Sequence, residues 1–261
     1  MDNKMILITT AVLSIICSLL GILTPIYSDI EWINAQVRGQ DAITIAAAVF
    51  LLIALRFRQP AKEIVTAGIS AYLVYTYFFY ALEVNLNVLF FCYLAILLLS
   101  IILLVRSINF LRTTDTMVPK NSYRMAGIIF MGIMALILTV LWSGDVIANL
   151  TGEPLLKNPT NEPFTIVYVL DLTFVVPAVV YAIVKSVQNK KIGYYLTGVM
   201  LIVITVMGLA LMGMTGGLML AGLSFDLFLA VFWAFLGTIG IVLAALYIRS
   251  LARQARREAR Q

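Results

Sequence analysis

Histidine is absent from this chain of 261 residues, and cysteine occurs only at Cys17 and Cys92. The absence of imidazole excludes bis-histidine haem, histidine-bound zinc and a histidine general base. The two cysteines form no Cys-x-x-Cys pair, which a quinone-linked thiol oxidoreductase would need. We interpret both as small buried residues, and we expect neither a cofactor nor a metal.

Charged residues are also scarce, at 12% of the chain, whereas 62% of the residues are hydrophobic. This composition is far from that of a soluble globular domain. A membrane-spanning helix needs about 20 mostly apolar residues. Eight stretches are candidates: 5–23, 41–55, 64–82, 88–105, 125–142, 164–184, 194–213 and 226–247. We therefore predict an all-α integral membrane protein, a polytopic bundle of about eight transmembrane helices that forms one domain over residues 1–261.

The charges between these stretches alternate in sign, and this alternation predicts the topology. If the N-terminus is cytoplasmic, sixteen of the 18 basic residues lie inside and only Arg38 and Lys157 lie outside. The positive-inside rule therefore predicts cytoplasmic N- and C-termini, and we place the protein in the plasma membrane of a prokaryotic cell. No small-residue cleavage site follows residues 5–23, so we expect an uncleaved first helix.

The basic segment 250–261 is predicted to be a cytoplasmic tail that lies against anionic lipid. It is short and carries no aromatic stacking residue, so nucleic acid is not an expected partner. The expected partner is the lipid bilayer, and the sequence is also compatible with a homo-oligomer.

Acidic residues concentrate on the predicted outer side. Acids respond weakly to the topology rule, so their position needs another reason. Asp226 follows Ser224 at the start of the last stretch and Asp41 opens the second, where an acid complements a helix N-terminus. The acids assigned to this side are Asp29, Glu31, Asp41, Glu83, Asp145, Glu153, Glu162, Asp171 and Asp226.

Asp171 lies too deep for capping. If the sixth span begins near residue 164, the rise per residue places this carboxylate about 10 Å into the bilayer. It should then face the bundle interior and have a partner, and Tyr168, one turn earlier, is a candidate donor. Pro177 is expected to kink the same span. A structural pin between helices and a ligand or ion site both remain open.

The second stretch, residues 41–55, is too short to cross a bilayer. Counting back about 20 residues from Arg56 draws Arg38, Gln40 and Asp41 into the span or its outer interface. Arg38 and Asp41 are three residues apart and can pair on one helical face. Arg38 is predicted to neutralise outer carboxylates or to bind an anionic group, and the alternative is that it snorkels to the headgroups.

Glu83 lies at the outer end of the third span, where a carboxylate opposes the helix dipole and needs a partner such as Arg38. Tyr80 and Trp142 suit an interfacial aromatic belt. Tyr72 and Tyr75 lie deeper and must find hydrogen-bond acceptors.

Residues 192–225 carry no charge, and the segment 213–222 is rich in glycine and methionine. Small residues allow close helix approach. A re-entrant loop is one interpretation, and we prefer a flexible helix end. The order of the loops further suggests a four-plus-four repeat of residues 1–124 and 125–250, with Asp41 and Asp171 on related helices.

Two functions follow from these patterns. The first is binding or transport of a small polar solute or cation in an outward-facing pocket. The alternative is a non-transporting scaffold, sensor or assembly partner whose polar groups lock helices together. An aspartyl-type membrane enzyme ranks third. Its candidate acids would be Asp171 and Asp226, and no recognisable sequence motif surrounds either of them. The residues predicted to line the pocket are Arg38, Asp41, Tyr80, Glu83, Tyr168, Asp171 and Asp226.

Overall fold

The computed structural model describes residues 2–115, 117–152, 155, 159 and 165–258, and for residues 252–258 it describes the backbone alone. Regular secondary structure in the described residues is helical throughout. Eight helices there are long and apolar enough to cross a membrane, as predicted, so the chain is a multi-pass membrane protein in contact with lipid. The predicted outer residues Glu153, Lys157 and Glu162 and the end of the basic tail, 259–261, lie outside the described residues.

Each predicted apolar stretch corresponds to one helical span, and most helices extend past the apolar stretch at one or both ends. The second helix begins at Glu31, ten residues before the apolar stretch, as the count back from Arg56 required. The sixth span is built of two α-helices joined by a π-helical turn. The elements are α1 Asn3–Leu23, α2 Glu31–Ala54, α3 Ala61–Leu82, α4 Phe90–Thr113, α5 Asn121–Leu150, α6 Thr165–Leu170, η1 Asp171–Val175, α7 Val176–Val187, α8 Lys191–Leu220 and α9 Leu227–Glu258.

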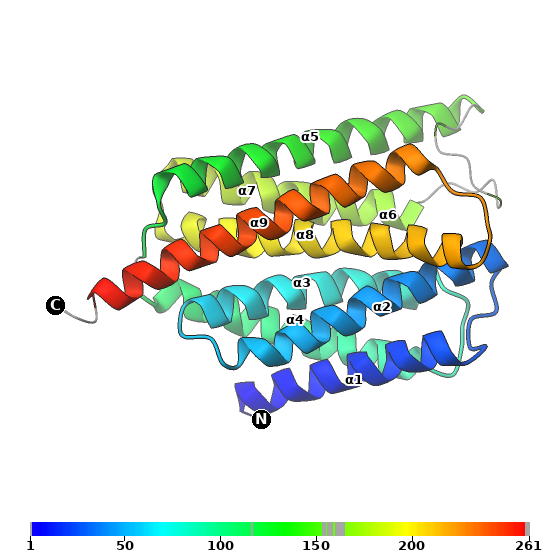
Figure 1. Ribbon diagram of the computed structural model, residues 1–261, viewed down its shortest axis with the longest axis horizontal. Coiled ribbons are helices and arrows are strands. Elements are labelled where there is room, and N and C mark those ends of the chain that lie inside the picture. The colour runs from blue at the N-terminus through cyan, green and yellow to red at the C-terminus, as the bar shows by residue number, and fades with distance from the viewer. Residues whose placement is uncertain (1, 116, 153–154, 156–158, 160–164, 259–261) are drawn as a thin grey trace.

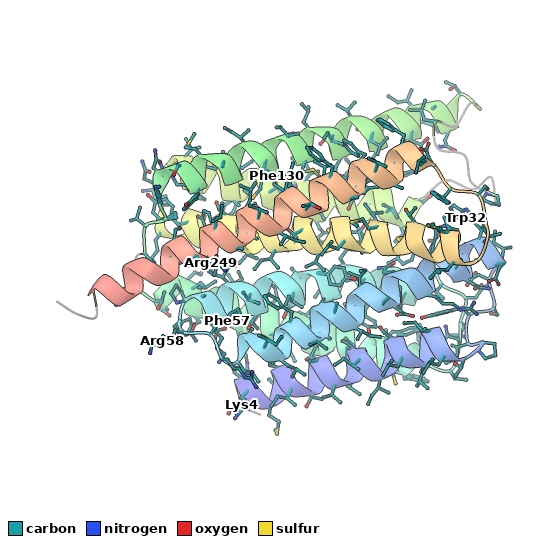
Figure 2. The ribbon with its side chains drawn as sticks, in the orientation of Figure 1. Lys4, Trp32, Phe57, Arg58, Phe130 and Arg249 are labelled. Atoms are coloured by element: carbon teal, nitrogen blue, oxygen red, sulfur yellow. The ribbon has the colours of Figure 1, made fainter. Side chains whose placement is uncertain are left out.

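The start of α1 and the end of α9 lie at the same end of the bundle (Figure 1), as an even number of spans requires. Lys4, Arg58 and Arg249 lie at this end, and Trp32 lies at the other (Figure 2). We call the first the basic end. The second, where the acidic residues of the α1–α2, α3–α4 and α8–α9 connections lie, we call the acidic end.

The central helices are α3 and α8, which pack against each other between the two outermost helices, α1 and α5 (Figure 1). In the most apolar part of each helix, 67% of the residues of α3 and 61% of those of α8 are buried, against 28% for both α4 and α9. The third span of each half is thus the most buried and the fourth the least. This shared order agrees with the repeat of residues 1–124 and 125–250, which stays a prediction.

Glycines allow α2 and α8 to touch backbone to backbone. A Cβ atom on Gly39 would overlap the carbonyl oxygen of Gly213, and one on Gly217 would overlap that of Ala35. The two pairs, Ala35 with Gly39 and Gly213 with Gly217, each span one helical turn, which is the small-residue spacing of close membrane-helix contacts. α8 runs through this segment to Leu220, so the re-entrant loop is wrong and the helical interpretation is confirmed.

Candidate functional site

A cavity of about 680 Å³ lies in the half of the bundle nearer the acidic end. Its walls come from α2, α3, α5, α6, η1, α8 and α9, and it reaches inward to Tyr72 and Ile204 near the middle of α3 and α8. Ser224, Phe225 and Asp226 are exposed and lie at its mouth. The volume lies within the range of about 300–1,000 Å³ typical of sites for small molecules.

Asp171 lies in the wall of this cavity with a side chain that is 3% exposed. The indole nitrogen Nε1 of Trp142 donates a hydrogen bond to its Oδ2 at 2.6 Å. Its Oδ1 has no hydrogen-bond partner among the described residues, although the Tyr75 hydroxyl is close enough to interact with the carboxylate. One oxygen of this buried carboxylate therefore accepts no hydrogen bond, in a residue that lines the cavity.

The predicted hydrogen bond from Tyr168 to Asp171 is wrong. Tyr168 donates instead to Oδ2 of Asp145, at 2.5 Å. Helical side chains tilt toward the N-terminus of their helix, so the long side chain of Tyr168 projects toward the acidic end and away from Asp171. Its ring packs against Trp142 with the centroids 5.4 Å apart, and Trp142 thereby becomes the donor to Asp171.

Asp171 is also the first residue of the π-helical turn. The backbone N–H of Val176 bonds to the carbonyl oxygen of Asp171, one residue further along than in an α-helix. Pro177 follows directly and has no N–H to donate, so the irregular turn occurs where the proline was expected to kink the span. Single π-helical turns occur frequently at functional sites.

Asp41 is buried at a different place, between α2, the α1–α2 connection and α3. Its Oδ2 accepts a hydrogen bond from Tyr27 at 2.6 Å and its Oδ1 accepts one from Tyr80 at 3.2 Å. Burial raises the pKa of Tyr27 well above its ordinary value, so this hydroxyl stays protonated and donates. A Cβ atom on Gly21 would overlap both Asp41 and Tyr27, so the glycine leaves the space in which these two residues form their hydrogen bond.

The two roles predicted for Asp41 are both wrong. It does not cap α2, because the helix begins ten residues earlier, at Glu31. It does not pair with Arg38, whose Nη1 lies 3.5 Å from Oε1 of Glu31. The arginine side chain tilts toward the helix N-terminus and hence toward Glu31, whereas Asp41 lies nearly one turn deeper. Arg38 therefore neutralises an outer carboxylate, as expected, but not the predicted one.

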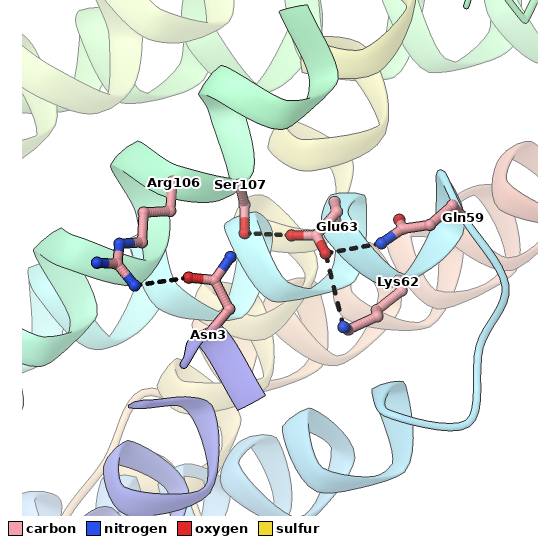
Figure 3. A network of polar contacts seen from close by, with 6 residues as sticks. All are labelled: Asn3, Gln59, Lys62, Glu63, Arg106 and Ser107. Atoms are coloured by element: carbon pink, nitrogen blue, oxygen red, sulfur yellow. Dashed lines mark hydrogen bonds and ion pairs between the residues drawn. The ribbon is translucent and has the colours of Figure 1, made fainter. Parts of the chain in front are cut away.

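Glu63 is a third buried carboxylate, at the basic end (Figure 3). Its Oε1 accepts a hydrogen bond from Gln59 at 2.9 Å and lies 3.8 Å from the ammonium of Lys62. Its Oε2 accepts one from Ser107 of α4 at 2.7 Å. Sequence reasoning missed this residue, although an acid in the first turn of a helix is a signal of favourable placement.

Asp145, on α5, is the fourth. Its Oδ1 accepts from the backbone N–H of Leu155 at 2.9 Å and its Oδ2 accepts from Tyr168. It therefore ties the α5–α6 connection to both helices. Of the four buried carboxylates in the described residues, Asp171 is the one with an oxygen that accepts no hydrogen bond.

Two of the seven predicted site residues, Asp171 and Asp226, line the cavity. Asp226 also accepts a hydrogen bond from the backbone N–H of Leu229 at 3.0 Å, which confirms that it caps the last helix. Glu83 is exposed just beyond α3 and is not a lining residue. The other four predicted residues take part in the contacts described above and likewise lie outside the lining: Arg38, Asp41, Tyr80 and Tyr168.

Sequence reasoning missed several residues that line the cavity. Gln36 and Gln40 project into it from one face of α2, and their spacing of four residues was a usable signal. All three tryptophans of the chain, Trp32, Trp142 and Trp233, also line it. Tryptophans at one end of a membrane protein are expected at the lipid interface, so this signal alone was ambiguous.

The chemistry of the wall is simple. Among the described residues of the wall, the charged ones are Asp171 and Asp226, both acidic, and most others are apolar or aromatic. The described residues contain no group of three or more metal-ligating side chains. No family model matches the chain, and neither a curated protein nor a solved structure matches it. The arrangement itself is suited to holding a small solute by one carboxylate.

Proposed function

We propose that this multi-pass membrane protein binds a small polar solute or cation in the cavity, with Asp171 as the anchoring group. The observation that carries the proposal is the carboxylate of Asp171, which belongs to a residue lining the cavity and whose buried Oδ1 accepts no hydrogen bond from the described residues. An ionisable group within a membrane-spanning helix is costly unless it is paired. A bound solute supplies the missing partner.

The alternative function, a scaffold or assembly partner, draws support from the other three buried carboxylates. Asp41, Asp145 and Glu63 each accept hydrogen bonds on both oxygens from within the chain. These groups lock helices and connections together, as a scaffold requires. A scaffold has no use for an open cavity or for an unpaired carboxylate oxygen, so Asp171 distinguishes the two functions.

The proposal includes an orientation. With the basic end in the cytoplasm, as the positive-inside rule predicts, the mouth of the cavity faces outward. Such a site can serve uptake or sensing, because both begin with the same binding step. A reporter enzyme active only in the cytoplasm, fused after residue 261, should be active, and an inactive fusion would reverse the orientation.

Solute access can be measured without knowing the ligand, because every tryptophan of the chain lines the cavity. Acrylamide, a small polar quencher, should reduce tryptophan fluorescence in the folded protein. Thr215 lines the cavity and Thr173 is exposed on the sixth span. Thr215→Phe should protect the tryptophans from acrylamide, whereas Thr173→Phe should not. Tryptophans that acrylamide fails to quench, or equal quenching in both variants, would contradict the proposal.

A further inference from the structure

We infer that the ligand of this cavity is a protonated amine that carries an apolar or aromatic group. The inference rests on the proposed function and assigns the chemical class of the solute. It joins three features of the wall: the sign of its charge, the unpaired acceptor on Asp171 and the aromatic side chains beside it.

The sign of charge selects a cation. Among the described lining residues the two charged ones are carboxylic acids, and none is lysine or arginine. Arg38, the described basic residue in the acidic half of α2, is paired with Glu31. Low polarity around the cavity strengthens the attraction of an acid for a cation and the repulsion of an anion. The charges on the described part of the wall would therefore repel an anionic solute.

The unpaired acceptor selects a donor. Oδ1 of Asp171 lacks a hydrogen bond, while Oδ2 already receives one from Trp142. A primary or secondary ammonium brings N–H groups that can satisfy Oδ1 through a charge-assisted hydrogen bond. A quaternary ammonium has the same charge but no N–H to donate. The geometry therefore favours an amine with at least one N–H.

The remaining wall selects a solute with an apolar body. Tyr75 and Trp142 lie beside the carboxylate, and aromatic faces attract organic cations. Trp233, Met207 and Leu211 extend the apolar wall. A bare metal ion would leave this surface empty, and the described residues offer it no cluster of ligands. An amine with an aromatic or aliphatic group uses both parts of the wall.

The test compares four probes of one shape on the purified wild-type protein. They are 2-phenylethylamine, its alcohol 2-phenylethanol, the quaternary phenethyltrimethylammonium and the anion 3-phenylpropanoate. Binding is followed by the emission of the three cavity tryptophans. We expect the amine to bind about tenfold or more tightly than the alcohol, because the alcohol can donate a hydrogen bond to the carboxylate but carries no positive charge to strengthen it. The quaternary ion should be intermediate and the anion weakest.

Asp171→Asn should abolish the preference for the amine over the alcohol. Asp115→Asn, which changes an exposed acid near the basic end, should keep it. The comparison of probes on the wild type needs no variant and stands even if Asp171→Asn fails to fold. Equal binding of amine and alcohol, tighter binding of the quaternary ion, or a preference that survives Asp171→Asn would each overturn the inference. If acrylamide still reaches the tryptophans in that case, the cavity proposal survives and only the ligand class is wrong.

Discussion

Asp41 and Asp171 lie on the second span of their respective halves of the chain, and both are almost fully buried. Asp41 is enclosed by the hydroxyls of Tyr27 and Tyr80 and takes no part in lining the cavity. Asp171 lines the cavity, and it accepts one hydrogen bond, from Trp142 to Oδ2, while its Oδ1 accepts none. Two buried acids on corresponding spans therefore differ in their surroundings: one has donors for both oxygens, and the other has a donor for one.

The difference shows that burial of an acid does not by itself indicate a binding site. Both carboxylate oxygens of Asp41 accept a hydrogen bond, and the rings of Tyr77 and Tyr93 pack against Tyr80 with centroids 5.7 and 5.5 Å away. A complete hydrogen-bonded cluster specifies one packing and rigidifies it. A buried acceptor that receives no hydrogen bond from the protein can instead receive one from a bound solute. The informative features are therefore the oxygen that accepts no hydrogen bond and the cavity that its residue lines.

Replacing Asp41 or Asp171 with alanine should give the largest difference in stability between the two sites. Asp41→Ala leaves the buried hydroxyl of Tyr27 without its acceptor, and we expect a loss of about 2 kcal/mol in stability. Asp171→Ala should cost about 1 kcal/mol or less, because the indole of Trp142 lines a cavity that polar solutes can reach. Thermal unfolding in detergent measures both. Equal losses would mean that Asp171 is as much a structural pin as Asp41.

Gly21→Ala should disturb the hydrogen bond between Asp41 and Tyr27 without removing either residue. Its Cβ would overlap Asp41 and Tyr27, and such overpacking costs about 1–3 kcal/mol. Gly216→Ala is the matched control, since a Cβ there meets nothing within 4 Å. Alanine favours a helix over glycine, so the control should be unchanged or slightly more stable. The same melting experiment compares them, and a neutral Gly21→Ala would contradict the tight fit.

Removing one donor from each acid should separate stability from binding. Trp142→Phe takes the donor from Asp171 and should weaken 2-phenylethylamine binding about fivefold, the effect of one hydrogen bond of about 1 kcal/mol. Tyr80→Phe should lower stability by about 1 kcal/mol and leave amine affinity within about twofold. Calorimetric titration and melting of both variants give the four values. A binding loss in Tyr80→Phe equal to that in Trp142→Phe would remove the distinction.

The smallest expected effect concerns the mouth of the cavity. Asp226→Asn keeps a side chain that can cap α9, so the melting temperature should not change. Loss of the charge should weaken amine binding by about twofold at low ionic strength, and this difference should vanish in high salt because the site is exposed. A large effect that persists in salt would place the anchoring charge at Asp226 instead of Asp171.

The eight helical spans and the location of basic residues at one end of the bundle could be predicted from the sequence, because span length and loop charge are local properties. The extension of α2 back to Glu31 followed from the distance that a helix must cover before Arg56. The capping role of Asp226 also depends on a few neighbouring residues. Burial of Asp171 followed from its depth in a single span.

The partners of the buried acids could not be predicted, because they come from other helices. Trp142 precedes Asp171 by 29 residues, and Tyr80 follows Asp41 by 39. Tyr27 lies in a connection, where helical periodicity gives no information about direction. The predictions that failed, Tyr168 with Asp171 and Arg38 with Asp41, both assumed that neighbours on one helix pair with each other. Side-chain tilt and competing partners on other segments decided otherwise.

The contact between Gly68 and Ile202 separates the cavity from the basic end of the bundle. Ile202 fills the space beside Gly68 between α3 and α8, just below the innermost lining residues, Tyr72 and Ile204. If a solute enters from the acidic end, as we propose, this contact closes its path about halfway through the bundle. Passage to the other side would require a second conformation in which Ile202 withdraws from Gly68, so this pair is the natural gate to probe if the protein is a carrier.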